Sequence, residues 1–195
     1  MLTLGMYGQC DFFHMKGVLE ELFEKLGLHH AFTYNPKGGY PFLHPGRQAA
    51  IQNGEDVIGY IGQLHPEVVE NYDMKGEVYV AVVDLPKLTA LASFDRKYEG
   101  IAKFPASTRD LSMVMSKEIF VGQVEAVIKK YGGKLLENYE LFDVYEGEQV
   151  GHGKKSVAYT LTFRAKDRNL EANEVNAIVD KIVEALKELG IELRG

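Results

Sequence analysis

The fold of the C-terminal half is decided by one alternating stretch, residues 155–164, which reads KSVAYTLTFR. Successive side chains of a β-strand point to opposite sides, so alternation of apolar and polar residues separates two faces. One face carries Val157, Tyr159, Leu161 and Phe163. The other face carries Ala158, Thr160, Thr162 and Arg164. The stretch therefore predicts a long strand that packs one face on a core and leaves the other polar.

The segments around this strand complete a β-α-β-β-α-β order. Further strands are expected at residues 110–115, 135–145 and 191–193, and helices at residues 120–131 and 174–189. The second helix has a broad apolar stripe at helical spacing, which indicates a buried face. This order is typical of the ferredoxin-like split βαβ domain. Both helices cover one face of such a sheet, so the other face is free to bind a partner.

The N-terminal half begins with a helical pattern and continues with short apolar strands. Residues 12–26 repeat apolar side chains at helical spacing, with Asp11 placed to cap the start and Gly27 to end the helix. Asn53-Gly54 favours a tight hairpin turn between two apolar runs. Pro66 suits the first position of a short helix, and residues 78–84 indicate a buried strand.

A mixed-charge stretch at residues 93–102 interrupts the apolar pattern. The sequence therefore predicts two α+β domains, residues 1–92 and 103–195, joined by this linker.

Composition limits the possible functions. Cys10 is the only cysteine, so no intrachain disulfide is possible and a reducing compartment is expected. No apolar run approaches the ~20 residues of a membrane span, so we expect no membrane partner. The net charge of −6 argues against indiscriminate nucleic-acid binding. Residues 1–102 hold 8 basic and 13 acidic residues, whereas residues 103–195 hold 14 and 15. A local basic patch in the second half can attract phosphate, although a solvated surface explains the same charges.

Motifs of catalysis and metal binding are missing from the sequence. It contains no phosphate-binding glycine loop, no CxxC, no HExxH and no GxSxG. His44 and His65 each precede a proline and are expected to be turn or cap residues rather than metal ligands. The adjacent His29 and His30 should point apart. We predict no metal site in this chain.

Several segments resemble the β subunit of bacterial phenylalanyl-tRNA synthetase. In the first half these are DFFHMKGVLEELFEKLGL at 11–28, FLHPGRQAAI at 42–51 and IGYIGQLHPEV at 58–68. In the second half they are FPASTRDLSMVM at 104–115, LFDVYEG at 141–147, GKKSVAYTLTFR at 153–164 and RNLEANEV at 168–175. The seven segments stand in the family's order and spacing. His14 departs from the family's acidic residue, and Asn169-Leu170-Glu171 departs from Thr-Leu-Thr, which puts local helix capping in doubt.

The resemblance implies the C-terminal part of that subunit. Residues 1–92 would be an incomplete class II synthetase catalytic-like antiparallel sheet module without catalytic activity, and residues 103–195 a ferredoxin-fold anticodon-binding domain. Arg47 is the nearest candidate for a phosphate-binding arginine, and we expect it to pair or cap structurally. The parent would be a cytoplasmic α2β2 ligase that joins phenylalanine to tRNA(Phe) and uses ATP and Mg²⁺ on its catalytic α subunit. No cofactor is expected in this chain.

The polar face of strand 155–164 is the predicted tRNA surface. Single-stranded RNA is recognised by stacking, by base-edge hydrogen bonds and by cations near the phosphates. The candidate tRNA-binding residues are Arg109, Tyr145, Lys154, Lys155, Thr160, Thr162 and Arg164. An ion pair between Arg109 and Asp110 is an alternative use of that arginine. Strand parity puts Phe142 and Tyr145 on opposite faces, and we expect Phe142 in the core and Tyr145 near the RNA.

Two other classes of protein fit the same pattern. A free-standing ferredoxin-like regulatory module would bind a small metabolite, and a structural interaction domain would bind neither metabolite nor RNA. Binding that weakens as salt rises would distinguish an RNA partner, because counterion release drives it.

Overall fold

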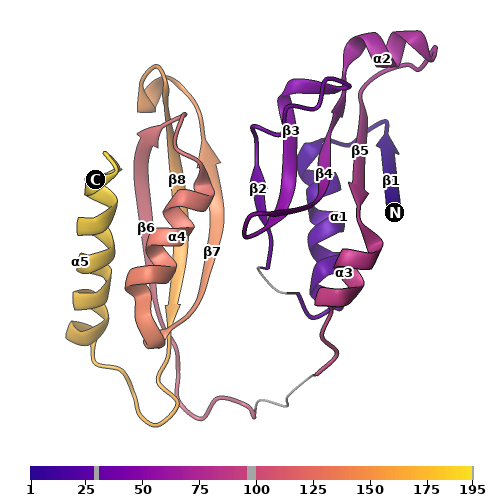
Figure 1. The fold of residues 1–195 in the computed structure, drawn as a ribbon. Coiled ribbons are helices and arrows are strands. Elements are labelled where there is room, and N and C mark those ends of the chain that lie inside the picture. The colour runs from indigo at the N-terminus through magenta and orange to yellow at the C-terminus, as the bar shows by residue number, and fades with distance from the viewer. Residues whose placement is uncertain (29–30, 96–99, 195) are drawn as a thin grey trace. The chain divides into compact units, whose positions relative to one another are not determined.

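The computed structural model describes residues 1–28, 31–95 and 100–194 and divides into two compact units, Met1–Tyr98 and Glu99–Gly195 (Figure 1). Each unit consists of an antiparallel sheet with helices, as the sequence predicts. Residues 96–99 of the expected linker lie outside the described residues, as do His29 and His30.

Unit 1 is built on a five-stranded sheet in the order β1-β5-β4-β3-β2. Its strands are β1 (Leu2–Tyr7), β2 (Thr33–Asn35), β3 (Leu43–Asn53), β4 (Asp56–Leu64) and β5 (Val78–Val83). Its helices are α1 (Phe12–Lys25), α2 (Pro66–Asn71) and α3 (Leu85–Leu91). The predicted hairpin joins β3 to β4, with Asn53 opposite Asp56 and Gly54 at a φ of 60°. Glycine occupies this left-handed conformation without steric cost.

Helix α1 supplies the helical side of the unit 1 core. Met15, Leu19 and Phe23 recur every four residues and are buried among apolar side chains of the sheet. The Asp11 carboxylate accepts a hydrogen bond from the His14 amide at 2.8 Å, which caps the helix as predicted. The His14 ring lies against Asp11 and completes a reciprocal cap, so the departure at His14 leaves this helix start intact.

Unit 2 has the β-α-β-β-α-β order predicted from the sequence. Its strands are β6 (Ser107–Ser116), β7 (Leu136–Tyr145), β8 (Lys154–Phe163) and β9 (Glu192–Leu193). Its α-helices are α4 (Val121–Gly132) and α5 (Ala172–Glu188), and short 3-10 turns are η1 (Gly133–Leu135) and η2 (Glu148–Val150). The sheet order β7-β8-β6-β9, antiparallel throughout, is that of the ferredoxin-like fold.

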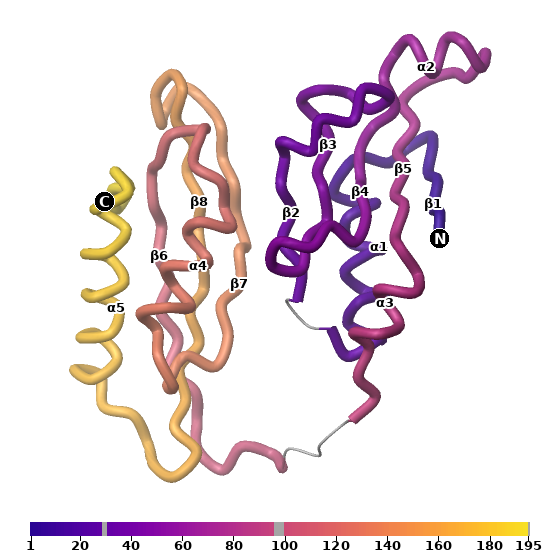
Figure 2. Tube along the Cα trace, in the orientation of Figure 1, coloured from indigo at the N-terminus to yellow at the C-terminus, as the bar shows by residue number. Residues whose placement is uncertain are grey.

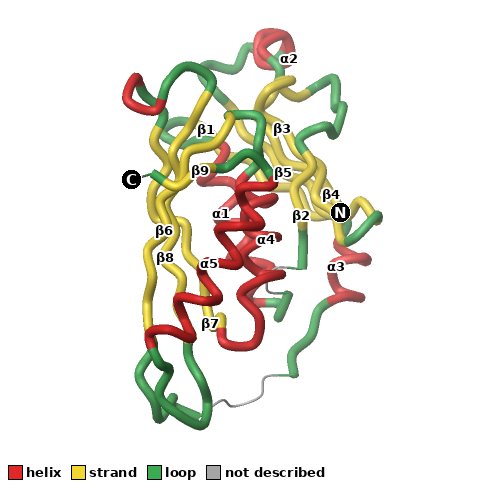
Figure 3. Tube along the Cα trace, turned by 90° about the vertical axis from the view of Figure 1, so that its left-hand side faces the viewer, coloured by secondary structure: helices red, strands yellow, loops and turns green. Residues whose placement is uncertain are grey.

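Both helices of unit 2 lie on one side of its sheet, as Figure 3 shows. The apolar face of β8 is buried against them, since Val157, Tyr159, Leu161 and Phe163 are at most 1% exposed. Val124, Ile128, Val175 and Ile182 are the helical residues that are fully buried in the same cluster. The predicted division of β8 into a core face and a polar face is therefore confirmed.

Helix α5 begins without a side-chain cap. Glu171 occupies the cap position, and its side chain makes no capping hydrogen bond. This is the weakness that the sequence indicates at this position.

Candidate nucleic-acid interface

The sheet of unit 2 has a face that no described helix covers, called here the open face. Residues directly opposite each other on antiparallel strands share a face. The open face therefore consists of the β8 residues that alternate with its core residues, together with the residues opposite them on the neighbouring strands. Strand β8 contributes Lys154, Ser156, Ala158, Thr160 and Thr162. Strand β6 contributes Thr108, Asp110, Ser112 and Val114, and β7 contributes Asn138, Glu140, Asp143 and Tyr145.

Four of the predicted tRNA-binding residues lie on the open face. Thr160 and Thr162 stand in the middle strand, and the Thr160 hydroxyl donates to an Asp110 carboxylate oxygen at 2.7 Å. Lys154 is exposed at the start of β8. Tyr145 lies opposite Ser156 and is 37% exposed. The face thus brings two hydroxyls, one ammonium group and one aromatic ring onto the same surface.

The other three predicted residues make contacts within unit 2. Arg109 lies opposite Leu161, on the helix side, and its Nε donates to Asn176 Oδ1 of α5 at 3.0 Å. Asp110 lies on the open face and accepts from Thr160, whereas the side-chain contacts of Arg109 are with Asn176, Ser107 and the Thr108 carbonyl. Lys155 also faces the helix side, and burial lowers the pKa of its ammonium group.

Arg164 follows β8 and is held by two segments of unit 2. Its Nε lies 2.9 and 3.0 Å from the two carboxylate oxygens of Glu137. Its Nη1 donates to the Phe104 carbonyl at 2.8 Å.

The prediction that Phe142 lies in the core is wrong. Leu141 is opposite Tyr159 and Asp143 is opposite Ala158, so Phe142 is an extra residue at a register shift in β7. Such a bulge breaks the two-residue parity on which the prediction depended. Phe142 is 55% exposed.

Three features of the open face were not anticipated. Ser112 and Ala158 are opposite each other and form a floor of small residues with Ser156. Ser156 and Ala158 are buried, at 4% and 5% exposed. Beside this floor, the Arg194 amide donates to the Ser112 carbonyl, and its guanidinium reaches Gln149 at 3.5 Å. The short side chains of Ser156 and Ala158 at alternate positions of one strand are the sequence signal that could have revealed the floor.

The charge of this face favours contacts to bases over contacts to phosphates. Asp110, Glu140, Asp143 and Glu192 are its acidic residues, and Lys154 and Arg194 are the cations beside them. Carboxylates accept hydrogen bonds from base amino groups but repel phosphates. Tyr145, which is 37% exposed, offers a stacking surface. The arrangement is suited to unstacked bases of a single-stranded loop.

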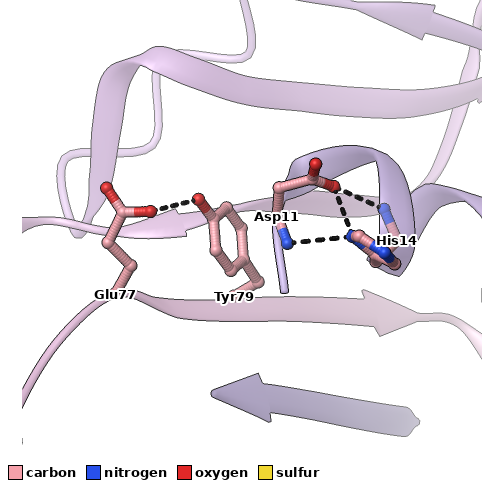
Figure 4. Close-up of polar contacts among 4 residues, drawn as sticks. All are labelled: Asp11, His14, Glu77 and Tyr79. Carbon is pink, nitrogen blue, oxygen red and sulfur yellow. Dashed lines mark hydrogen bonds and ion pairs between the residues drawn. The ribbon is translucent and has the colours of Figure 1, made fainter. Parts of the chain in front are cut away.

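Unit 1 contains a polar network of its own at the end of its sheet. Arg47 Nη1 donates to Gln63 at 2.6 Å and to Glu77 at 2.8 Å, and the Tyr79 hydroxyl donates to Glu77 at 2.7 Å. Figure 4 shows the Glu77–Tyr79 contact together with the Asp11–His14 cap. The Tyr79 hydroxyl and then the Arg47 guanidinium lower the pKa of Glu77.

This network bears on nucleotide binding by unit 1. Arg47 is the only arginine in residues 1–95. Its guanidinium, which would have to bind a phosphate, already donates hydrogen bonds to Gln63 and Glu77. The expected structural pairing of Arg47 is confirmed. Arg47 is therefore engaged within unit 1 and is not free to bind a nucleotide phosphate.

The two proline-preceding histidines have local roles. His44 Nδ1 accepts from the Gly46 amide at 3.1 Å, and His65 Nδ1 accepts from the Glu67 amide at 3.3 Å. His65 is the N-cap of α2. Both are turn or cap residues, as predicted. Among residues 1–28, 31–95 and 100–194, no cluster of three His, Cys, Asp or Glu side chains could hold a metal ion. No helix in those ranges is long and apolar enough to cross a membrane.

The structure defines a two-unit α+β protein, in which a ferredoxin-like unit with a polar open face follows an antiparallel sheet unit. Comparisons with known proteins specify the family. Residues 102–194 match the family model of the ferredoxin-fold anticodon binding domain, and residues 3–85 match that of the phenylalanyl tRNA synthetase beta chain CLM domain. The chain belongs to the phenylalanyl-tRNA synthetase β-chain family.

Curated relatives agree with this assignment. The chain is 44% identical over 195 residues to the phenylalanine–tRNA ligase beta subunit of Clostridium acetobutylicum, covering all of this chain and 24% of that protein. It is 41% identical over 194 residues to that of Clostridium tetani, covering 99% of this chain and 24% of the relative. With the subunit of Symbiobacterium thermophilum, identity is 42% over 185 residues, covering 95% and 20%. The chain thus spans 20–24% of the length of these three relatives.

Proposed function

We propose that this chain acts as part of the β subunit of phenylalanine–tRNA ligase. Unit 2 binds the anticodon region of tRNA(Phe), and unit 1 supports a catalytic α subunit without taking part in the chemistry. The observation that carries the proposal is the succession of two matches, a β-chain CLM domain and then an anticodon-binding domain, in one polypeptide. The open face of unit 2 supplies the surface that such binding requires.

Each group on the open face has a distinct part in this function. Tyr145 stacks on an unpaired base, and the hydroxyls of Thr160 and Thr162 bond to base edges or ribose. Lys154 lies at the rim, where it attracts the phosphate backbone. Arg109, Lys155 and Arg164 act indirectly, because their contacts with other residues of unit 2 hold the surface in shape.

The enzyme as a whole is the α2β2 ligase of the cytoplasm. ATP with Mg²⁺ supplies activation of the amino-acid carboxyl group there. Unit 1 lacks a free arginine for a nucleotide phosphate in its described residues, so this chain positions tRNA and leaves activation to the α subunit.

A tRNA titration of the assembled ligase tests the proposal. Binding of tRNA(Phe) should weaken as salt rises, and it should weaken again when the anticodon bases are replaced. Thr162→Val should reduce the preference for the correct anticodon while phenylalanine-dependent pyrophosphate exchange stays unchanged. The purified 195-residue chain should show no such exchange. Equal affinity for tRNAs with correct and replaced anticodons would refute anticodon binding.

A further inference from the structure

Arg164 joins three segments of unit 2 at one end of its sheet. The Arg164 amide donates to the Leu135 carbonyl at 2.9 Å, so its backbone is tied to the last residue of η1, directly before β7. Its Nε donates to both carboxylate oxygens of Glu137, the second residue of β7. Its Nη1 binds the Phe104 carbonyl, which belongs to the segment that leads into β6. The side chain is 26% exposed, the less exposed member of this ion pair.

The Phe104 contact holds a segment that has few other restraints. Residues 100–103 are exposed and belong to no helix or strand. Pro105 has no amide proton to donate, and it restricts Phe104 to an extended conformation. The carbonyl of Phe104 therefore points in a defined direction, and Arg164 anchors it. Figure 2 shows that the chain enters unit 2 at the end of the sheet where β7 begins and β8 finishes.

The charge of Arg164 is already neutralised in this arrangement. Two of its nitrogens are engaged, and a carboxylate lies within 3.0 Å. A phosphate would have to compete with Glu137 for the same guanidinium. Lys154, by contrast, is exposed and free to approach an RNA backbone.

We propose that Arg164, together with Glu137, is a positioning residue that clamps the entry segment 103–106 to the sheet. The clamp fixes the direction in which the chain enters the anticodon-binding unit, and it thereby limits where the open face can be presented to tRNA. This role rests on the proposed function, because it assigns a use to the orientation of an anticodon-binding unit. A domain whose orientation is restrained has a higher effective concentration at its binding site than a domain that reorients freely.

The clamp itself is tested without tRNA. Trypsin cleaves after Lys103, inside the clamped segment, and mass spectrometry gives the cleavage rate at that bond in the native 195-residue chain. Arg164→Met and Glu137→Gln should each raise this rate about threefold to tenfold, because each removes charge-assisted hydrogen bonds of the clamp. Arg168→Met is the matched control: it breaks the comparable Arg168–Glu174 pair at 2.6 Å without touching the entry segment, and it should leave cleavage after Lys103 unchanged. Unchanged cleavage in both clamp variants would overturn the proposal.

The positioning role is tested in the assembled ligase. Arg164→Met and Glu137→Gln should both raise the KM for tRNA, and the factor should be similar for the two variants. Both should change kcat little and leave the slope of log affinity against log salt unchanged. A phosphate contact would behave differently: loss of Arg164 would flatten that slope by about one unit, whereas Glu137→Gln would free the arginine and strengthen binding. The charge exchange Arg164→Glu with Glu137→Arg should recover part of the loss. A flattened slope, or tighter tRNA binding by Glu137→Gln, would show that Arg164 touches RNA instead. Faster cleavage after Lys103 with unaltered tRNA kinetics would also refute the positioning role. Absence of tRNA binding by the unmodified ligase would instead refute the proposed function, and it would not affect the evidence for the clamp.

Discussion

Gly59 in the middle of the unit 1 sheet offers a sharp test of the packing. A Cβ atom at this position would lie 2.2 Å from the Val82 carbonyl oxygen and 3.0 Å from Val83 Cα. Real Cβ atoms do not approach other heavy atoms so closely, so the backbone of β4 or β5 has to move. Gly5 on β1 is the matched control, since a Cβ there would meet nothing within 4 Å.

The expected cost of Gly59→Ala follows from two opposing effects. Overpacking costs about 1–3 kcal/mol, and a clash with backbone belongs in the upper part of that range. Loss of backbone freedom in the unfolded chain returns about 0.4–1 kcal/mol. A net loss of about 2 kcal/mol remains, which corresponds to about 8–16 °C in the Tm of a unit of this size. Gly5→Ala should leave the Tm of unit 1 unchanged or slightly higher.

Calorimetry is the suitable assay, because the chain has no tryptophan to report unfolding by fluorescence. The two units have separate hydrophobic cores, so the unit 2 transition serves as an internal reference. A Gly59→Ala variant whose unit 1 transition matches that of Gly5→Ala would refute the close approach of β4 and β5.

Three further outcomes are expected. Lys154→Ala should weaken tRNA binding by the assembled ligase and flatten its salt slope by about one unit, as measured by titration at several salt concentrations; an unchanged slope would exclude a phosphate contact. Glu171→Asp should supply the cap that α5 lacks and stabilise unit 2 by about 1 kcal/mol in calorimetry, whereas a lower Tm would contradict that cap assignment. Because the folded pKa of Glu77 lies below its ordinary value of 4.5, its stabilising effect is present above that pH and is lost as pH falls. Glu77→Gln should therefore make the Tm of unit 1 less sensitive to acid between pH 6 and pH 3, roughly the span over which carboxylates titrate. Equal acid sensitivity of the variant and the unmodified chain would count against the network.

Much of the fold could be predicted because local patterns decide it. Strand β8 alternates over its whole length, and helix α1 carries both its apolar repeat and its cap within the same few residues. Strand β1 could not be recognised from its own residues, because its pairing partner β5 is distant in the chain, with Leu2 opposite Val83. Helix α3 is only seven residues long and has little periodic pattern.

The candidate site was predictable in its location but less so in its details. The hydroxyls of β8 follow directly from strand parity, whereas the bulge at Phe142 depends on how β7 meets β8. The partners of Arg109 and Arg164 are Asn176 and Glu137, which are distant in sequence. Whether a cation is free or already paired is decided by tertiary contacts, so a count of basic residues does not reveal it.

The two hydrophobic clusters have no residue in common, and this separation has a consequence for synthesis on the ribosome. All buried residues of the first cluster precede the first residue of unit 2. Translation at roughly 5–20 residues per second takes several seconds to add a further hundred residues, and small domains commonly fold within that time. Unit 1 can therefore complete its sheet before the strands of unit 2 emerge. The nascent chain thus avoids exposing two sets of unpaired strand edges at once, which lowers the chance that strands of different units pair with each other.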